Sequence, residues 1–446
     1  MSYFSEYKSK LRTAEEAVKV VKSGDYVEYG LGCTMPRALD KALADRKEEL
    51  TDIKVRGMFT MHPLHIIEKD PKRETFTYSV WQLSGLDRSY HDRGLCSYVA
   101  GVYRFKPTYY RKYLTVDVAM LTVSPMNDEG YFSFSYVNSS QKAICEAAKV
   151  VILEINENLR WVSGGFDDKI HISEVDFIVE SDNQPLDEIP DIHATEVDKK
   201  IAENIMPYIK DGSNIQLGIG GMPNVIGKMI AQSDLKDLGM YTEMVCESFM
   251  DMDEAGKLTN KYNKVGGGKG VWSVTLGTKK LYDWMAENER QLSFPVNHVN
   301  SPYVMSQNDN LTCIVNCVSL DLFSQFSSES SGTRQISGTG GQIDFVEGAF
   351  ESNGGQCFIA LSSTRKDKDG NLISRIVPTF KQGEIVSTPR SLAFYAATEY
   401  GVVNLAGKST WERAEAVISL AHPDFREDLI KEAEKMNIWR RSNKLK

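Results

Sequence analysis

The sequence lacks the long apolar runs that membrane segments require. No stretch of about 18 apolar residues occurs among its 446 residues. Segment 1–25 mixes acidic and basic side chains in a helical pattern, without the apolar core of a secretory signal. We therefore expect no membrane partner and a cytoplasmic location.

The sequence also lacks an excess of positive charge. Lysine and arginine total 52 against 61 aspartates and glutamates, a net charge of -9. Nucleic-acid binders usually present a basic face or stripe, so we expect no nucleic-acid partner. A local basic site for an anionic cofactor is still compatible with this balance.

Cysteine is scarce, and its pattern does not predict disulfides or a metal site. The seven residues are scattered and odd in number, which favours free, buried thiols in a reducing compartment. They are Cys33, Cys96, Cys145, Cys246, Cys313, Cys317 and Cys357. Cys313 and Cys317 have no second Cys/His pair nearby, and His62 and His65 in MHPLH read as loop or core residues. No metal is predicted.

The chain is too long for one typical hydrophobic core. With 41% hydrophobic and 25% charged residues it has an ordinary globular composition, so two domains are expected. Strand-like runs alternate with helical patterns, which predicts α/β architecture. The runs include VDVAML, AKVVILEIN, VDFIVE, LTCIVNCV and QCFIALSS. Prolines and acids accumulate in 180–196, so we place the boundary near 195, giving domains 1–195 and 196–446.

An internal repeat supports this division. SGDYVEYGLGCTMPRALDKAL, from Ser23, resembles DGSNIQLGIGGMPNVIGKMIA, from Asp211. The matching positions are Gly24 with Gly212, Gly30 with Gly218, Gly32 with Gly220 and, after a one-residue slip, Pro36 with Pro223. Each copy follows an amphipathic helix pattern and leads through a strand into glycines and another helix. The pattern indicates a duplicated α/β unit.

The glycine turn of the second copy could bind an anion. LGIGGMPNVIG follows a predicted strand and opens a predicted helix, so backbone N–H groups are free to meet phosphate, pyrophosphate or an oxyanion. A dinucleotide fingerprint is the rival interpretation, but Pro223 stands where its third glycine is needed. Glu243, at the end of the next strand-like segment, would serve that interpretation as a ribose binder.

Two further glycine clusters are weaker candidates. VGGGKGVW (265–272) lacks the Lys-Ser/Thr pair of a phosphate loop and reads as a flexible loop. SGTGGQIDF (337–345) precedes a hydrophobic run, and its backbone could approach a ligand closely or simply form a tight turn.

Many ordered segments resemble one known family, the acetyl-CoA hydrolase/transferase family, and its butyryl-CoA:acetate and 4-hydroxybutyrate CoA-transferase branch most closely. The segments are IQLGIGGMPN, YTEM, LGTKKLYD, ISGTGGQIDFVEGAF, ALSSTRKDKDG, SRIVPTF, TEYGVVNLAGKS and AHPDFREDLIKEA. The resemblance runs almost end to end. It implies a tandem pair of CoA-transferase-type α/β domains, in agreement with the repeat.

The resemblance also implies site residues. Glu243 in YTEM corresponds to the family's nucleophile, although Tyr241 stands where relatives often have histidine. The residues implied to contact CoA are Gly218, Ile219, Gly220, Gly221, Met222 and Gly341 through backbone, Val318 through its main chain, and Lys368 through its side chain. An ammonium group near an anionic cofactor is physically sensible. No cofactor is expected to be bound permanently, since the CoA thioester is the substrate.

The implied reaction moves CoA from a short acyl-CoA, such as butyryl-CoA, to acetate through a glutamyl-CoA thioester, with ping-pong kinetics. The alternatives are a 4-hydroxybutyrate or propionate CoA-transferase, an acyl-CoA hydrolase of the same family or, from another class, a non-catalytic nucleotide-binding protein. The expected partners are an acyl-CoA and a short-chain carboxylate. A homo-oligomer is the common assembly for such enzymes.

Overall fold

The structure is a computed structural model that describes residues 3–189, 193–286, 288–440 and 442. The chain forms two compact units, which are treated separately below. Unit 1 contains the described residues up to 189 together with 271–299, and unit 2 contains 193–270 and the described residues from 300 onward.

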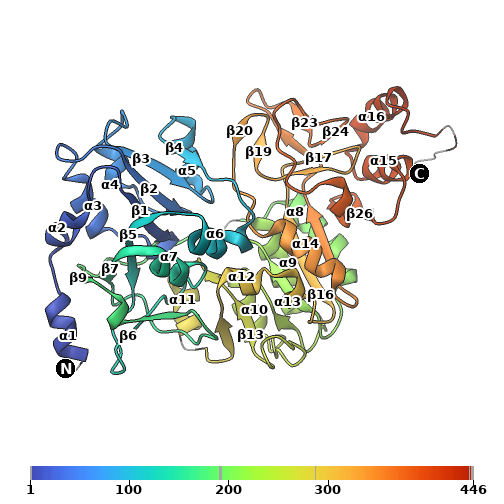
Figure 1. Cartoon of the computed structure of the whole chain (residues 1–446). Helices are drawn as coiled ribbons and strands as arrows, with labels where there is room; N and C mark the ends of the chain where they lie inside the picture. Colours follow the sequence, from blue (N-terminus) through green and yellow to red (C-terminus); the bar gives the residue numbers. More distant parts are fainter. Residues whose placement is uncertain (1–2, 190–192, 287, 441, 443–446) are drawn as a thin grey trace. The chain divides into compact units, whose positions relative to one another are not determined.

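Unit 1 is built on a seven-stranded sheet whose neighbouring strands are all parallel (Figure 1). In spatial order the strands are β4 (Cys96–Tyr98), β3 (Phe76–Val80), β2 (Ile53–Met58), β1 (Tyr26–Leu31), β5 (Val116–Val123), β7 (Ala148–Ile155) and β9 (Phe177–Glu180). Its longer helices are α1 (Tyr3–Lys10), α3 (Ala38–Ala44), α5 (Gly85–Asp92), α6 (Lys106–Lys112), α7 (Gln141–Ala147) and α11 (Lys279–Ala286). The predicted strands in VDVAML, AKVVILEIN and VDFIVE are confirmed.

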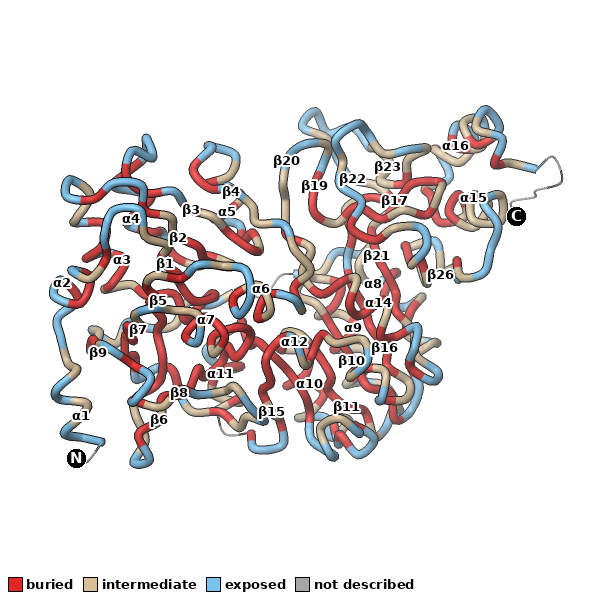
Figure 2. The backbone as a smooth tube through the Cα atoms, in the orientation of Figure 1, coloured by how far each residue is buried: buried red, intermediate tan, exposed pale blue. Residues whose placement is uncertain are grey.

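The strands of unit 1 bury side chains on both faces, as parallel sheets require. Val118 and Met120 of β5 belong to a core cluster with Leu39 and Leu43 of α3. Leu121 and Val123 of the same strand belong to a second cluster. Because successive residues of a strand point to opposite faces, the two clusters are the two sides of one sheet. Figure 2 shows β5 and β7 as largely buried backbone, whereas α1 is mostly exposed or intermediate.

Unit 2 is built on a six-stranded sheet, parallel except for its last pair. In spatial order the strands are β11 (Gly239–Met240), β10 (Asn214–Leu217), β16 (Leu311–Asn316), β21 (Gln356–Ala360), β25 (Tyr395–Thr398) and β26 (Gly401–Asn404). Its longer helices are α8 (Glu196–Ile205), α9 (Gly221–Gln232), α10 (Glu247–Glu254), α14 (Gln342–Glu351), α15 (Thr410–Ser419) and α16 (Pro423–Lys435). The predicted α/β fold class is confirmed in both units.

Five strands of each sheet share one order, which supports the duplication; beyond these five, unit 1 adds β3 and β4 next to β2, and unit 2 adds β26 next to β25. In unit 1, β2-β1-β5-β7-β9 follow each other in space, and β11-β10-β16-β21-β25 do so in unit 2. In chain order both series run 2-1-3-4-5, an order whose ligands bind beyond the carboxyl ends of the first and third strands. The sequence also indicates that β2 corresponds to β11. At the carboxyl ends of these strands, GMFT (57–60) matches GMYT (239–242).

One segment departs from the predicted boundaries. Residues 271–299 belong to unit 1, although the predicted domain 196–446 contained them. The reason is backbone pairing: the N–H of Thr275 donates to the carbonyl of Tyr136 at 2.7 Å, and the N–H of Asn138 to that of Ser273 at 3.1 Å. These bonds satisfy polar groups that would otherwise be buried without partners.

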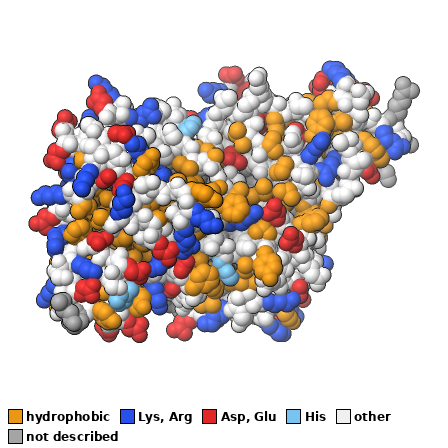
Figure 3. All heavy atoms as spheres, in the orientation of Figure 1, with side chains coloured by type: hydrophobic (Ala, Val, Ile, Leu, Met, Phe, Trp, Pro, Cys, Tyr) orange, Lys and Arg blue, Asp and Glu red, His pale blue; other side chains and the backbone are white. Residues whose placement is uncertain are grey.

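The surface and the thiols agree with the composition. On the face drawn in Figure 3, acidic and basic side chains are interspersed over the surface. All seven cysteines are free and buried, as predicted. Among the described helices, none is long and apolar enough to cross a membrane.

Candidate active site

Glu243 lies just beyond β11, between that strand and β12 (Met244–Val245). The backbone before it is fixed. The N–H of Tyr241 donates to the carbonyl of Ile215 at 3.0 Å, and the hydroxyl of Thr242 donates to the carbonyl of Met244 at 2.9 Å. Tyr241 and Thr242 are fully buried, whereas Glu243 is only partly buried. The chain therefore presents this one side chain from a rigid strand exit, and Tyr241 serves as a core residue.

The carboxylate of Glu243 is held by an amide. Asn300 donates from Nδ2 to Glu243 Oε2 at 2.6 Å and also to Asp344 Oδ2 at 3.3 Å. Asn300 and Asp344 are both fully buried. The sequence did not single out either residue. Asp344 stood within the ISGTGGQIDFVEGAF segment, but Asn300 carried no sequence signal.

Gly341 makes room for this arrangement. It is the N-cap residue of α14, and a Cβ placed on it would lie 2.1 Å from Glu243 Oε2 and 2.5 Å from Asn300 Nδ2. Any side chain at this position would therefore displace the carboxylate or the amide. The structure brings Gly341 to Glu243; its contact with CoA remains a prediction.

Burial changes the acidity of Glu243. Desolvation raises its pKa from 4.5 to about 7, because removal from water disfavours the charged form, and the hydrogen bond from Asn300 opposes this rise. A carboxyl group near neutrality is poised between its acid and its nucleophilic form. Such a perturbed group is a candidate for catalysis.

The predicted glycine turn connects β10 to α9, directly beside the strand that leads to Glu243. Gly220 is the N-cap of α9, with a φ of 131° that side chains rarely adopt. A Cβ on Gly218 would meet no atom within 4 Å, and one on Gly220 would first meet Asn316 Nδ2 at 3.8 Å. The turn is therefore open at Gly218 and Gly220, whereas a Cβ on Gly221 would lie 3.2 Å from Asp198 Oδ2. Met222 is buried, and Pro223 stands in the first turn of α9, where no intrahelical N–H bond is lost.

The other two predicted contact residues differ in their surroundings. Val318 follows β16, the strand next to β10, and its N–H donates to the carbonyl of Ser327 at 2.8 Å. Only its carbonyl is therefore left to meet a ligand. Lys368 is exposed in the turn between β22 (Thr364–Lys366) and β23 (Leu372–Ser374). Within the described residues, no hydrogen bond or ion pair joins it to Glu243, so its contact with CoA stays a prediction.

The corresponding position in unit 1 carries no carboxylate. The match of GMFT to GMYT places Met61 at the position of Glu243. A side chain of the same unit caps the N-terminus of α3, the helix that follows β1. Glu154 accepts hydrogen bonds from the N–H groups of Arg37 at 3.1 Å and Leu39 at 3.0 Å. A protein carboxylate thus fills the place that an anion could take in the second copy.

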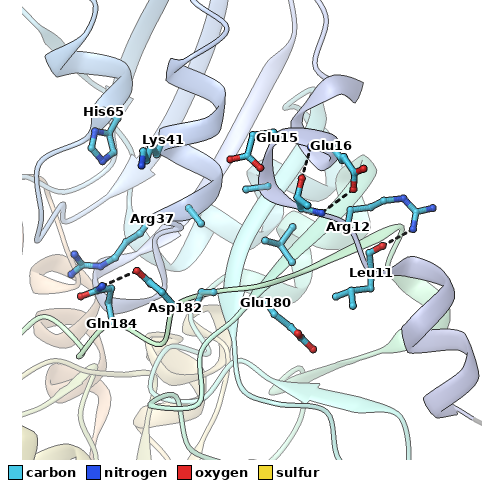
Figure 4. Close-up of a pocket in the computed structure, with 15 residues that line it drawn as sticks. Leu11, Arg12, Glu15, Glu16, Arg37, Lys41, His65, Glu180, Asp182 and Gln184 are labelled. Atoms are coloured by element: carbon cyan, nitrogen blue, oxygen red, sulfur yellow. Dashed lines mark hydrogen bonds between the residues drawn. The ribbon is translucent and has the colours of Figure 1, made fainter.

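Unit 1 has a surface depression of about 790 Å³ away from these residues (Figure 4). Both acidic and basic side chains line it, and some are already engaged. Arg12 donates to the carbonyl of Leu11 at 2.6 Å, and Arg37 pairs with Asp187 at 2.6 Å. It lacks the convergent polar groups of one charge that an anionic ligand needs. In the described part of the chain, no group of three His, Cys, Asp or Glu residues could hold a metal ion.

Fold and site together define an α/β enzyme of the CoA-transferase class. Residues 1–190 match the acetyl-CoA hydrolase/transferase N-terminal domain, and residues 277–433 match the corresponding C-terminal domain. The chain belongs to the acetyl-CoA hydrolase/transferase family, which confirms the resemblance seen in its segments.

Individual relatives cover nearly the whole chain. A butyryl-CoA:acetate CoA-transferase from Anaerostipes caccae is 50% identical over 446 residues, 100% of both chains. The crystal structure of RipA from Yersinia pestis matches with a TM-score of 0.89 at 33% identity, covering 98% of this chain and 100% of that one. A 4-hydroxybutyrate CoA-transferase from Porphyromonas gingivalis matches with a TM-score of 0.77 at 31% identity, covering 97% and 100%.

Proposed function

We propose that this protein transfers CoA from a short-chain acyl-CoA, butyryl-CoA first, to acetate, with Glu243 as the nucleophile. The observation that carries the proposal is the setting of Glu243. Its carboxylate projects from a rigid strand exit, accepts a hydrogen bond from buried Asn300, and fits against a glycine that leaves it space. The choice of butyryl-CoA and acetate rests on the relative that is 50% identical over the full length.

The first half of the reaction conserves the energy of the thioester. A Glu243 oxygen attacks the acyl carbonyl carbon, the C–S bond breaks, and CoA leaves as its thiolate, giving an acyl-glutamyl anhydride. The thiolate then attacks the glutamyl carbonyl carbon, and butyrate leaves with the electron pair. A glutamyl-CoA thioester remains on the protein.

The second half repeats these steps in reverse order with acetate. Acetate attacks the glutamyl thioester, CoA thiolate leaves, and the thiolate then attacks the acetyl carbonyl. Acetyl-CoA departs and the Glu243 carboxylate is restored. No oxidant, reductant or net proton is consumed in the complete reaction.

Each attack on the glutamyl carbonyl places negative charge on an oxygen that Asn300 already contacts. An N–H that is prepositioned for this oxygen stabilises the tetrahedral intermediate, and such donors are worth about 3 kcal/mol elsewhere. The backbone amides at Gly218 and Gly220, where the turn after β10 is open, are candidates for the second oxyanion, at the acyl carbonyl of the substrate.

Initial rates separate transfer from hydrolysis. Acetyl-CoA formation from butyryl-CoA should depend on acetate and give parallel double-reciprocal lines as acetate is varied, the pattern of a ping-pong mechanism. Release of free thiol at the same rate without acetate would instead make the protein a hydrolase. Intersecting lines would contradict a covalent intermediate.

A further inference from the structure

We propose that Asp344 is a positioning residue that keeps the N–H side of the Asn300 carboxamide turned toward Glu243. The inference rests on the proposed function, because it assigns Asp344 a role in the same reaction. Asp344 acts through Asn300, and no contact with substrate is assigned to it.

The carboxamide of Asn300 is held from one side. Its Nδ2 carries two hydrogens, and the two acceptors are Glu243 Oε2 at 2.6 Å and Asp344 Oδ2 at 3.3 Å. Its Oδ1 is buried and has no hydrogen-bond partner among the described residues. The orientation of the amide is therefore set by the two carboxylates that its nitrogen meets.

A flipped amide would turn its oxygen toward those carboxylates. In the resting enzyme both acids oppose the flip. Once Glu243 is acylated or carries CoA, its oxygen is no longer charged, and the hydrogen bond that it accepts from Asn300 becomes weaker. Asp344 Oδ2 then remains as the acceptor that keeps an N–H directed at the glutamyl oxygen, at the stage when the oxyanion forms.

The first turn of helix α14 contributes two residues to the surroundings of Glu243. Gly341 at its N-cap gives Glu243 room, and Asp344 stands in its first turn. Asp344 and Asn300 are both 0% exposed, so solvent cannot take over as the acceptor. A single helical turn thus provides both the room for the nucleophile and the orientation of its donor.

A double-mutant cycle on the full-length enzyme tests the inference. kcat and KM for butyryl-CoA are measured on the high-pH plateau, where Glu243 is ionised, for wild type, Asp344→Asn, Asn300→Ala and the double variant. We expect Asp344→Asn to lower kcat by about 10- to 100-fold, with KM within about 2-fold. In the Asn300→Ala background the same change should lower kcat by less than about 2-fold, because the residue it acts through is already gone.

Losses that multiply in the double variant would overturn the inference, as would a kcat within about 2-fold of wild type for Asp344→Asn. Asp321→Asn is the matched control, since Asp321 is a buried acid of unit 2 that accepts from the N–H groups of Phe323 and Gln325. It should change the melting temperature without coupling to Asn300. If Asp344→Asn does not fold, Asp344→Ser enters the same cycle.

Wild-type turnover separates the two hypotheses. A wild type that forms no acetyl-CoA from butyryl-CoA and acetate overturns the proposed function, and the role of Asp344 with it. A wild type that turns over, combined with multiplying losses, overturns only the role of Asp344.

Discussion

At Glu243, a carboxylate must be partly dehydrated and still chemically available. Its neighbours Tyr241 and Thr242 are fully buried, but its own side chain keeps some exposure. The structure gives a physical reason for choosing it over the nearby acids Glu247 and Asp251. Only Glu243 among these accepts the short hydrogen bond from buried Asn300.

Replacing Glu243 by glutamine removes the proposed nucleophile but keeps the shape of the side chain. We expect kcat to fall by at least about 10³-fold, with butyryl-CoA still bound. Glu247→Gln, in the first turn of α10, is the control and should keep kcat within about 2-fold of wild type. If kcat fell equally in Glu243→Gln and Glu247→Gln, the assignment of Glu243 as the nucleophile would be contradicted.

The raised pKa of Glu243 predicts opposite effects of pH on activity and stability. Activity needs the carboxylate, so kcat/KM should rise with pH and level off above a pKa of about 7.

The folded state binds this proton more tightly than the unfolded state, so stability contributed by Glu243 is full below pH 4.5 and is lost as pH rises through 7. Glu243→Gln should therefore be more stable than wild type at pH 8, by up to about 3 kcal/mol, and similar at pH 4.5. Denaturant unfolding at both pH values measures this, and equal stability at pH 8 would contradict a strongly desolvated carboxyl group.

Gly341 is the residue at which added volume should act most directly on the nucleophile. Gly341→Ala is expected to lower kcat by about 10²-fold, because the new methyl group must push Glu243 or Asn300 out of place. Gly85→Ala is a fair comparison, since a Cβ there makes ordinary contact at 3.6 Å, and it should leave kcat unchanged. Full activity of Gly341→Ala would mean that the carboxylate does not react from the position seen here.

At the scale of elements, the strand exits decide where ligands can bind. β10 and β16 are neighbours, and they are the first and third strands of the 2-1-3-4-5 order, so their carboxyl ends form the switch point of unit 2. The turn Gly218–Met222 and Val318 both follow these strands. The resemblance and the topology therefore select the same edge of the sheet by independent routes.

The Gly220 turn should affect binding more than it affects folding. Gly220→Ala is strained by its φ of 131°, and Gly24→Ala, also in open space at a φ of 90°, is strained in a comparable way in unit 1. Each should lose about 1 to 2 kcal/mol of stability. Only Gly220→Ala should also raise KM for butyryl-CoA, by about 10-fold. Equal KM values for the two variants would mean that the Gly220 turn does not contact butyryl-CoA.

The local elements were predictable because their signals are local. Glycine turns, alternating apolar runs and amphipathic helices lie within short windows, and the strands in LTCIVNCV and QCFIALSS appeared where expected. Glu243 was named through the resemblance, since composition offered other acids nearby. Asn300 and Asp344 were not predicted, because they meet Glu243 only through tertiary packing. The GMFT and GMYT match was present in the sequence and would have ruled out a nucleophile in unit 1, where Met61 stands.

At the scale of the whole molecule, the two compact units do not coincide with the division at residue 195. Segment 271–299 returns to unit 1 and pairs with Tyr136–Asn138. The glycine-rich VGGGKGVW (265–272) stands at the start of this segment, but it was interpreted as a flexible loop and not as a crossing between domains. The duplication is therefore visible in the strand order but interrupted along the chain.

The return of segment 271–299 to unit 1 predicts how fragments of the chain behave. Fragment 1–195 should unfold without a cooperative transition, or at a much lower melting temperature than the full chain, because it lacks 271–299 and leaves buried polar backbone unpaired. Adding 271–299 through a linker should restore cooperativity. Thermal unfolding followed by circular dichroism measures both fragments. A fragment 1–195 as stable as the full chain would show that the segment is not needed by unit 1.

The central claim is that Glu243 carries CoA covalently, and mass spectrometry of the intact protein tests it most directly. The protein is incubated briefly with butyryl-CoA, with and without acetate, and then digested and mapped. We predict a CoA-sized adduct on the peptide containing Glu243, lost on addition of acetate and absent from Glu243→Gln. An adduct on another residue, or butyryl-CoA turnover with no covalent species, would contradict the account.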